Sequence, residues 1–215
     1  MAQTVWVERF GEREPNGVLG DYCTVKSGFA FKSSWWQEKG VKVIKIKNIN
    51  STGLDLNDCS FVSDKKIAVA QEFIARTGDL LIAMTGATIG KFTMIPQIDE
   101  VLLVNQRVGK FFFKEAPVFE RLPFLWCTLK QENVFNEVIN RGQGSAQPNI
   151  SPTDIMTIPI FVPSSDELAD FNQAMQSSFE SITANHAENA HLAALRDTLL
   201  PRLMSGELSC CRSHR

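Results

Sequence analysis

The feature that most constrains the fold is an apolar stripe of helical spacing that follows residue 164. Ser164 and Glu167 form a Ser-x-x-Glu capping box, which marks the start of a helix. Apolar residues then recur at helical intervals, pause over a polar stretch and resume: Leu168, Phe171, Met175, Phe179 and Ile182, then Leu192, Leu195 and Leu199. A straight helix over 166–200 would be about 50 Å long, more than the diameter of a small domain. We therefore expect it to project from the body and its stripe to need a partner.

Two sequence features limit this helix. The polar stretch 183–188 interrupts the apolar seam, so that the pattern is a broken heptad. Pro201 is expected to end or kink the helix, because proline lacks the amide hydrogen that helical bonding needs. We assign 164–208 to the helical region and expect the tail 209–215 to be disordered.

The preceding residues, 1–163, show a mixture of strand and helix patterns. Residues 41–49 alternate in part, as a half-buried strand does, and 78–85 form a short apolar run that suits a buried strand. Residues 119–138 have the apolar spacing of a helix, and 156–162 are a further strand candidate. The predicted fold class is α+β, with a mixed globular domain followed by a long helix.

Composition and charge give weaker guidance. Of 215 residues 44% are hydrophobic, which is enough for a substantial core. The formal net charge of −2 does not by itself indicate a nucleic-acid partner, although six lysines and one acid, Glu38, lie between residues 24 and 48. No apolar run is long enough to span a bilayer, and the first residues lack a signal-peptide pattern. We expect a cytoplasmic protein without membrane contact.

Metal and redox chemistry find little support in the sequence. The five cysteines include no Cys-x-x-Cys pair, and the chain has only three histidines, so the pattern of a zinc site is missing. The isolated cysteines at 23, 59 and 127 are typical of small core residues in a reduced protein.

Catalytic motifs are equally weak. Gly86, Gly90 and Lys91 resemble a phosphate loop, but three residues rather than four separate the glycines, and Phe92 stands where a Ser or Thr would bind magnesium. A turn between two strands is the favoured interpretation, and a phosphate-handling enzyme is the minor alternative. We find no nucleophile–His–acid arrangement and no Asn-Pro-Pro-aromatic motif. We therefore expect no catalysis and no cofactor on this chain.

Polar side chains on predicted turns remain as candidate DNA contacts. Gln and Asn can bond bidentately to adenine and Arg to guanine, whereas Lys and Ser can contact phosphate. The candidates are Lys26, Lys32, Lys45, Lys47, Asn48, Lys91, Gln106, Arg107, Arg141, Gln143, Ser145 and Gln147. The alternatives are a structural loop over 142–151, in which Asn149 and Ser151 bond their own backbone, a solvated face for the lysines and a bulge at 105–107. The pair Trp35 and Trp36 is assigned to the core in preference to an exposed contact.

Several segments, taken in order, resemble the specificity subunit of type I restriction-modification systems. They comprise 19–22 with 27–28, Val43-Ile-Lys-Ile-Lys-Asn48, Gly78-Asp-Leu-Leu-Ile-Ala83, 90–91, Val104-Asn-Gln-Arg107, Gly144-Ser-Ala-Gln-Pro-Asn-Ile-Ser151, 154–155, 158–159 and 195–208. The most specific segment is the closing Leu199-Leu-Pro-x-Leu-x-Ser-Gly-Glu-Leu208 on a long helix. The resemblance covers nearly all of 19–208.

The resemblance implies a division of labour. Residues 1–163 would be a target recognition domain that reads a DNA half-site. Residues 164–208 would form a helix that pairs with another such helix as an antiparallel coiled coil and docks methyltransferase subunits, which in turn bind the restriction subunit. S-adenosylmethionine, ATP and magnesium would belong to those partners.

The family also sets an expectation about a second copy. A full-length subunit has two recognition domains and two such helices, whereas this chain has one of each. From the resemblance we expect either a truncated product or a half-subunit that forms a homodimer and reads an interrupted palindrome. The alternative function is a protein-interaction module that uses the helix and binds no DNA.

Overall fold

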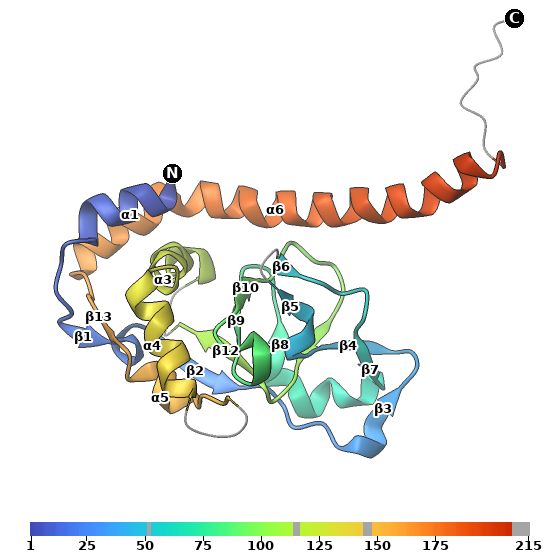
Figure 1. The fold of residues 1–215 in the computed structure, drawn as a ribbon, viewed down its shortest axis with the longest axis horizontal. Coiled ribbons are helices and arrows are strands. Elements are labelled where there is room, and N and C mark those ends of the chain that lie inside the picture. The colour runs from blue at the N-terminus through green and yellow to red at the C-terminus, as the bar shows by residue number, and fades with distance from the viewer. Residues whose placement is uncertain (51–52, 114–116, 144–147, 208–215) are drawn as a thin grey trace, which may run out of the picture.

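The computed structural model describes residues 1–50, 53–113, 117–143 and 148–207. Its helices are α1 (Ala2–Phe10), α2 (Leu19–Tyr22), α3 (Leu122–Leu129), α4 (Glu132–Gly142), α5 (Pro152–Met156) and α6 (Ser165–Met204). Short 3-10 helices are η1 (Ser33–Trp35), η2 (Ile46–Asn48), η3 (Asp64–Lys66), η4 (Ala68–Phe73), η5 (Gly86–Thr88) and η6 (Val118–Glu120). The predicted α+β class is confirmed, with a globular body and a long C-terminal helix (Figure 1).

Two sheets form the body. An antiparallel sheet has the order β10 (Phe92–Met94), β9 (Leu80–Ala83), β12 (Val108–Phe112) and β2 (Thr24–Ser27). A mixed sheet has the order β3 (Trp36–Gln37), β7 (Ser60–Val62), β4 (Val41–Ile44), β11 (Leu102–Val104) and β8 (Ile74–Ala75), in which β4 and β11 run parallel. Two short pairs complete the strands: β1 (Gly17–Val18) with β13 (Pro159–Ile160), and β5 (Ile49–Asn50) with β6 (Gly53–Leu54).

Strand β9 shows how the layers are built. Leu80 and Ile82 belong to the core under the helices, whereas Leu81 and Ala83 belong to the core between the two sheets. All four side chains are buried, because successive residues of a strand point to opposite faces and both faces are covered. The prediction of a buried strand within 78–85 is thereby confirmed.

The helical prediction for 119–138 is also confirmed, although the pattern belongs to two helices, α3 and α4. Helix α3 is buried on nearly every side, and Phe124 lies at the centre of an aromatic cluster. The predicted strand within 156–162 is shorter than expected: α5 ends at Met156 and only β13 is extended.

Helix α6 is the dominant element of the molecule. It contains 40 residues and is therefore about 60 Å long. Ser164 caps it as predicted: its hydroxyl accepts a hydrogen bond from Glu167 N, and the Glu167 carboxylate accepts one from Ser164 N. The helix passes through Pro201 and ends one turn later at Met204 rather than at the proline.

The first half of the α6 stripe does not need an external partner, which corrects the sequence prediction. Leu168, Phe171, Met175 and Phe179 are buried against the chain's own α1 and α3. The ring centroid of Phe171 lies 5.5 Å from that of Phe10 in α1 and 6.4 Å from that of Phe124 in α3. The predicted boundary at 163/164 therefore marks the start of the helix but not an edge of the core.

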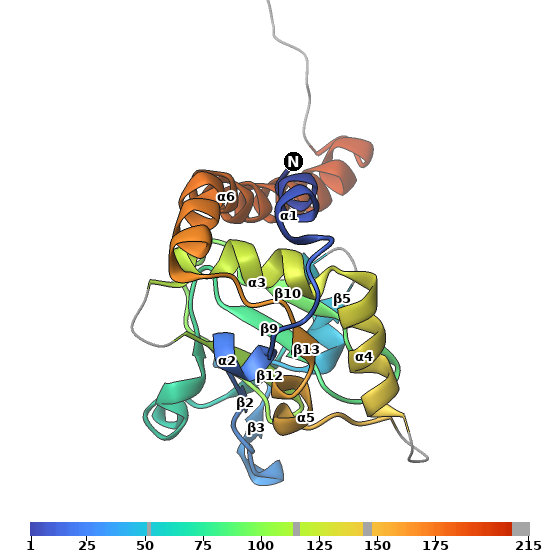
Figure 2. The ribbon, with the colours of Figure 1, turned by 90° about the vertical axis from the view of Figure 1, so that its left-hand side faces the viewer.

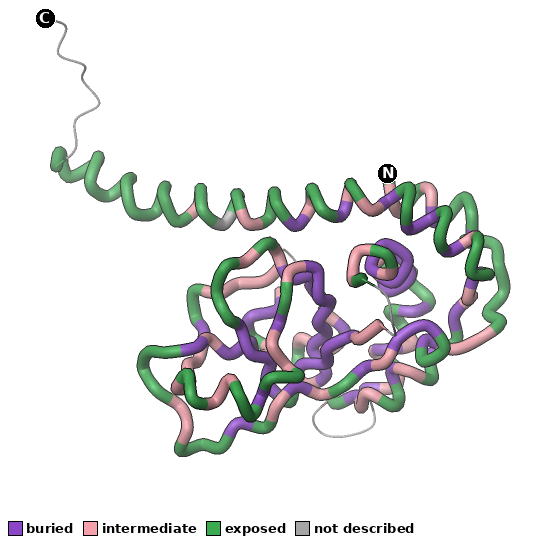
Figure 3. Tube along the Cα trace, turned by 180° about the vertical axis from the view of Figure 1, so that it is seen from behind, coloured by how far each residue is buried: buried purple, intermediate pink, exposed green. Residues whose placement is uncertain are grey.

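The second half of the stripe has the opposite environment. Ile182 is half-buried at the margin of the body, whereas Leu192, Leu195 and Leu199 are 52%, 41% and 40% exposed. Figure 3 shows the change along the helix, from a partly buried segment beside the body to an exposed projection. The unpartnered part of the stripe thus begins at Leu192. The predicted disordered tail, 209–215, lies outside the described residues.

Candidate nucleic-acid interface

Backbone hydrogen bonds bring three distant segments together at one edge of the body. Met84 N donates to the carbonyl of Arg107 (3.1 Å), and Ile150 N donates to the carbonyl of Met84 (2.9 Å). Thr85 and Asn149 form an isolated antiparallel bridge next to these bonds. The 105–107 turn, the end of β9 and the segment that enters α5 therefore lie side by side.

The end of β2 joins this edge because residue 28 is a glycine. A Cβ atom on Gly28 would lie 2.5 Å from both the Asn105 and the Val104 carbonyl oxygens, which no side chain can occupy. Gly28 N donates to the Val108 carbonyl (2.9 Å), and this contact places Ser27 beside the turn.

The resulting surface, which we call the polar edge, consists of Ser27, Thr85, Gln106, Arg107, Asn149 and Ser151. These residues line a shallow depression of about 340 Å³. Gln106, Arg107 and Asn149 are exposed. Within the described part of the chain, neither the Arg107 guanidinium nor the Gln106 amide takes part in a hydrogen bond or ion pair. Both side chains are therefore available to an outside ligand.

Arg141, a predicted DNA contact, and Ser151 of the polar edge are both held by bonds within the chain. The Arg141 guanidinium contacts the Glu137 carboxylate (3.0 Å), the Asp154 carbonyl (3.0 Å) and Thr157 Oγ1 (2.5 Å), so that it joins the end of α4 to α5. Ser151 caps α5: its hydroxyl accepts from Asp154 N and donates to the Asp154 carboxylate. These bonds from Ser151 lower the pKa of Asp154. Arg141 and Ser151 thus shape the loop base, as the structural-loop alternative proposed for Ser151.

Asn48 has a structural role, which corrects its prediction as a DNA contact. It is 2% exposed. Its amide oxygen accepts from Lys45 N (2.9 Å), and its amide nitrogen donates to the carbonyls of Asp55 (2.9 Å) and Asp58 (3.1 Å). A side chain with these buried bonds is unavailable to DNA.

None of the predicted lysine contacts lines the depression at the polar edge. Lys26 pairs with the Glu72 carboxylate, and Lys47 Nζ lies 2.6 Å from an Asp58 oxygen. Lys45 Nζ lies 3.7 Å from the centre of the Trp36 ring, and burial, followed by the charge of Lys47, lowers its pKa. Lys32 lies over Trp35 at 5.6 Å.

Trp35 and Trp36 are half-buried and cover the mixed sheet together with Phe29 and Phe31. Gln143 is exposed at the end of α4. Ser145 and Gln147 lie outside the described residues.

The glycines around Lys91 form a turn, in agreement with the favoured interpretation. Gly86 and Gly90 have φ angles of +73° and +78°, which glycine adopts without strain. Helix η5 between them links β9 to β10, and Gly90 packs against Phe135 of α4. Lys91 does not reach the polar edge: it lines a separate groove with Lys130 and His186.

Thr85 is the residue of this edge that the sequence analysis missed. It is the second residue after strand β9, and its hydroxyl is buried without a hydrogen-bond partner among the described residues. The available signal was its position between a buried strand and Gly86, where a polar side chain must lie at the rim of the sheet.

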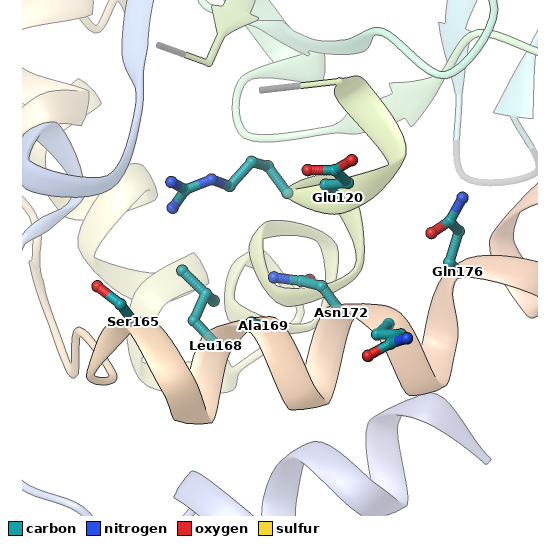
Figure 4. A pocket seen from close by; sticks show the side chains of 8 residues that line it. Glu120, Ser165, Leu168, Ala169, Asn172 and Gln176 are labelled. Carbon is teal, nitrogen blue, oxygen red and sulfur yellow. The ribbon is translucent and has the colours of Figure 1, made fainter. Parts of the chain in front are cut away.

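A further cavity lies between η6 and the first turns of α6 (Figure 4). Its volume is about 510 Å³, and its lining includes Glu120, Arg121, Asn172 and Gln176. Two of these side chains already serve packing: Arg121 lies over the Tyr22 ring, and Asn172 bonds α3. This cavity therefore carries mixed charge and gives no indication of a nucleic-acid ligand.

Over the described ranges, no group of three or more His, Cys, Asp or Glu side chains is placed to hold a metal ion. No helix in those ranges is long and apolar enough to cross a membrane.

Comparisons with known proteins agree on one family. A family model described as the type I restriction modification DNA specificity domain matches residues 16–194. The chain is 25% identical over 193 residues to the type I restriction enzyme MjaVIII specificity subunit of Methanocaldococcus jannaschii, with 88% of this chain and 45% of that protein covered. It is 34% identical over 123 residues to the HindI specificity subunit of Haemophilus influenzae, with 57% and 26% covered. The chain thus spans less than half the length of these relatives.

The fold is shared with a solved structure. The type I restriction-modification system S subunit from M. genitalium superposes with a TM-score of 0.57 at 16% identity, over 93% of this chain and 49% of that one. The match extends the agreement from sequence to architecture.

Proposed function

Because the chain belongs to the type I restriction modification DNA specificity family, we propose that it reads a DNA sequence through its polar edge and catalyses no reaction itself. Arg107 and Gln106 carry this proposal. They come from one turn, they are exposed, and their donor groups are unpaired within the described residues. Arginine bonds guanine bidentately and glutamine bonds adenine, so that neighbouring side chains of these two types suit a base-reading surface.

The position of the edge supports the same proposal. Ser151 of the edge caps α5, and α5 lies on the side of the body opposite α6 in two perpendicular views (Figures 1 and 2). DNA on the α5 side would leave the projecting helix accessible to other proteins. DNA recognition and the binding of other subunits would then use opposite faces of the molecule.

We further propose that the exposed half of α6 binds a second copy of this chain. Its stripe, Leu192, Leu195 and Leu199, lacks cover, and an antiparallel pairing of two such helices would bury it. Two-fold pairing would hold two polar edges at a fixed separation, so the target would be an interrupted palindrome. Methyltransferase subunits, and a restriction subunit through them, would bind S-adenosylmethionine, ATP and magnesium in the cytoplasm.

Fluorescence anisotropy tests the DNA proposal. The chain, purified with its methyltransferase partner, is titrated with labelled target and with scrambled duplex at fixed salt. R107A should lose about 1–3 kcal/mol of target affinity and little affinity for scrambled DNA, because Arg107 is assigned to base readout. R9A, which changes an exposed arginine on α1, is the matched control and should bind as the wild type does.

The rival function gives a different pattern. An interaction module that binds no DNA would still assemble with its partner. Neither the wild type nor R107A would then prefer target DNA over scrambled DNA. Arg141, although a predicted DNA contact, is unsuitable for this test, because its substitution would also remove the bonds that join α4 to α5.

A further inference from the structure

A groove beside α6 is distinct from both the polar edge and the apolar stripe. It has a volume of about 440 Å³, and Lys91, Lys130 and His186 line it together with Phe92, Trp126 and Phe135. His186 belongs to α6, whereas the other residues belong to the body. We call it the cationic groove.

Contacts between the body and α6 fix the shape of this groove. Gln97 N donates to the Thr183 carbonyl at 3.2 Å. Gly53 lies against His186, since a Cβ atom there would be 3.7 Å from His186 Nδ1. The His186 wall is therefore held to the body, unlike the helix beyond Leu192.

The lining combines cations with accessible aromatic surface. Lys130 Nζ lies 4.9 Å from the centre of the Trp126 ring, and the Phe92 ring meets Trp126 edge-on at 5.1 Å. Phe135 is 39% exposed and adds accessible aromatic surface to the groove. Over the described residues, no carboxylate lines the groove. An occupant that complements it carries negative charge next to an apolar group.

We propose that the cationic groove binds a segment of the methyltransferase subunit that carries a carboxylate beside an apolar side chain. The choice of the methyltransferase subunit as partner rests on the proposed function. The chemistry of the bound segment is inferred from the cationic and aromatic side chains that line the groove. Contact with His186 places the occupant against α6, on the side of the body away from the polar edge, and so favours a protein over DNA.

Charge reversal in the full chain tests the proposal. K91E/K130E should weaken binding to the purified methyltransferase subunit by about tenfold or more. Its affinity for target DNA, measured by anisotropy with the methyltransferase subunit at a saturating concentration, should be unchanged. K91Q/K130Q should weaken it less and make the affinity less sensitive to salt. K39E/K65E makes the same change in net charge at two exposed lysines elsewhere on the body, and should bind the subunit as the wild type does.

Each other outcome overturns the proposal. Loss of DNA affinity with normal assembly would assign the groove to DNA, and altered self-association with normal assembly would assign it to a second copy. If binding to the methyltransferase subunit, DNA affinity and self-association were all unchanged, the groove would have no binding role. If K91E/K130E fails to fold, as judged by circular dichroism, K91E/H186E replaces it, because His186 is exposed. The proposed function fails separately, if the wild-type complex shows no preference for target DNA.

Discussion

Asn172 Oδ1 accepts a hydrogen bond of 3.0 Å from the backbone nitrogen of Phe124 and thereby joins α6 to the first turn of α3. The first amide groups of a helix have no partner within it, so that this side chain satisfies a donor that burial would otherwise leave unpaired. The bond fixes where the long helix meets the body. It makes the first half of α6 part of the recognition domain rather than a separate spacer.

Loss of that bond should destabilise the fold. We expect N172A to lower the free energy of unfolding by about 1–3 kcal/mol, because a buried amide of α3 is left unsatisfied. Urea titration followed by circular dichroism measures the difference. Q173A, at the next position and exposed, is the control. Equal stability of the two variants would show that the bond contributes nothing.

The two halves of the α6 stripe should respond differently to truncation. F171A should cost about 3–5 kcal/mol of folding stability, because Phe171 is fully buried among aromatic rings. L195A/L199A should leave the stability of the dilute monomer unchanged and weaken self-association in sedimentation experiments. Self-association that survives in L195A/L199A would refute pairing through this part of the helix.

These two halves also show what sequence reasoning can reach. Spacing alone identified the helix, its cap at Ser164 and the residues on its apolar face. It could not say which of those residues the chain covers itself, because Phe10 and Phe124, which pack on Phe171, are distant in sequence. The spacing of apolar residues predicts that one face of a helix is buried, but it does not identify the residues that cover that face.

The polar edge shows the same limit for the site. Polar residues in turns identified Gln106 and Arg107 as candidates, and the structure leaves both exposed. The same criterion chose Asn48 and Arg141, whose side chains bond the chain itself. Both groups contain one amide side chain and one arginine, so residue type does not distinguish them. They differ only in whether the side chain bonds to another part of the chain. Thr85 was missed because it joins the edge through a contact with residue 149.

A buried ion pair joins β12 to the start of β9 within the antiparallel sheet and should be important for stability. Lys110 Nζ lies 2.5 Å from the Asp79 carboxylate, and both side chains are less than a tenth exposed. K110M should cost about 3–5 kcal/mol, because it leaves a buried carboxylate without its cation. K26M removes the exposed pair with Glu72 and should cost no more than about 1 kcal/mol. Similar losses in urea titrations of the two variants would contradict this assignment.

Burial also predicts the reactivity of Cys127. It raises the pKa of this thiol to about 12, so that the reactive thiolate is rare at neutral pH and grows as the pH rises toward that value. Alkylation by iodoacetamide at pH 8, followed by mass spectrometry of the peptide that contains Cys127, should be about a thousandfold slower in the native protein than in urea. Equal rates would show that the thiol is neither buried nor shifted.

The central claim is that this chain selects DNA sequence through the polar edge, and a methylation map of the genome tests it most directly. The host is a strain that lacks this gene but expresses the methyltransferase partner, complemented with the wild type or R107A. We predict a methylated split motif with symmetric halves for the wild type, and loss or relaxation of that motif for R107A with normal assembly of the complex. An identical motif in both strains, or methylation of the motif without the chain, would contradict the account.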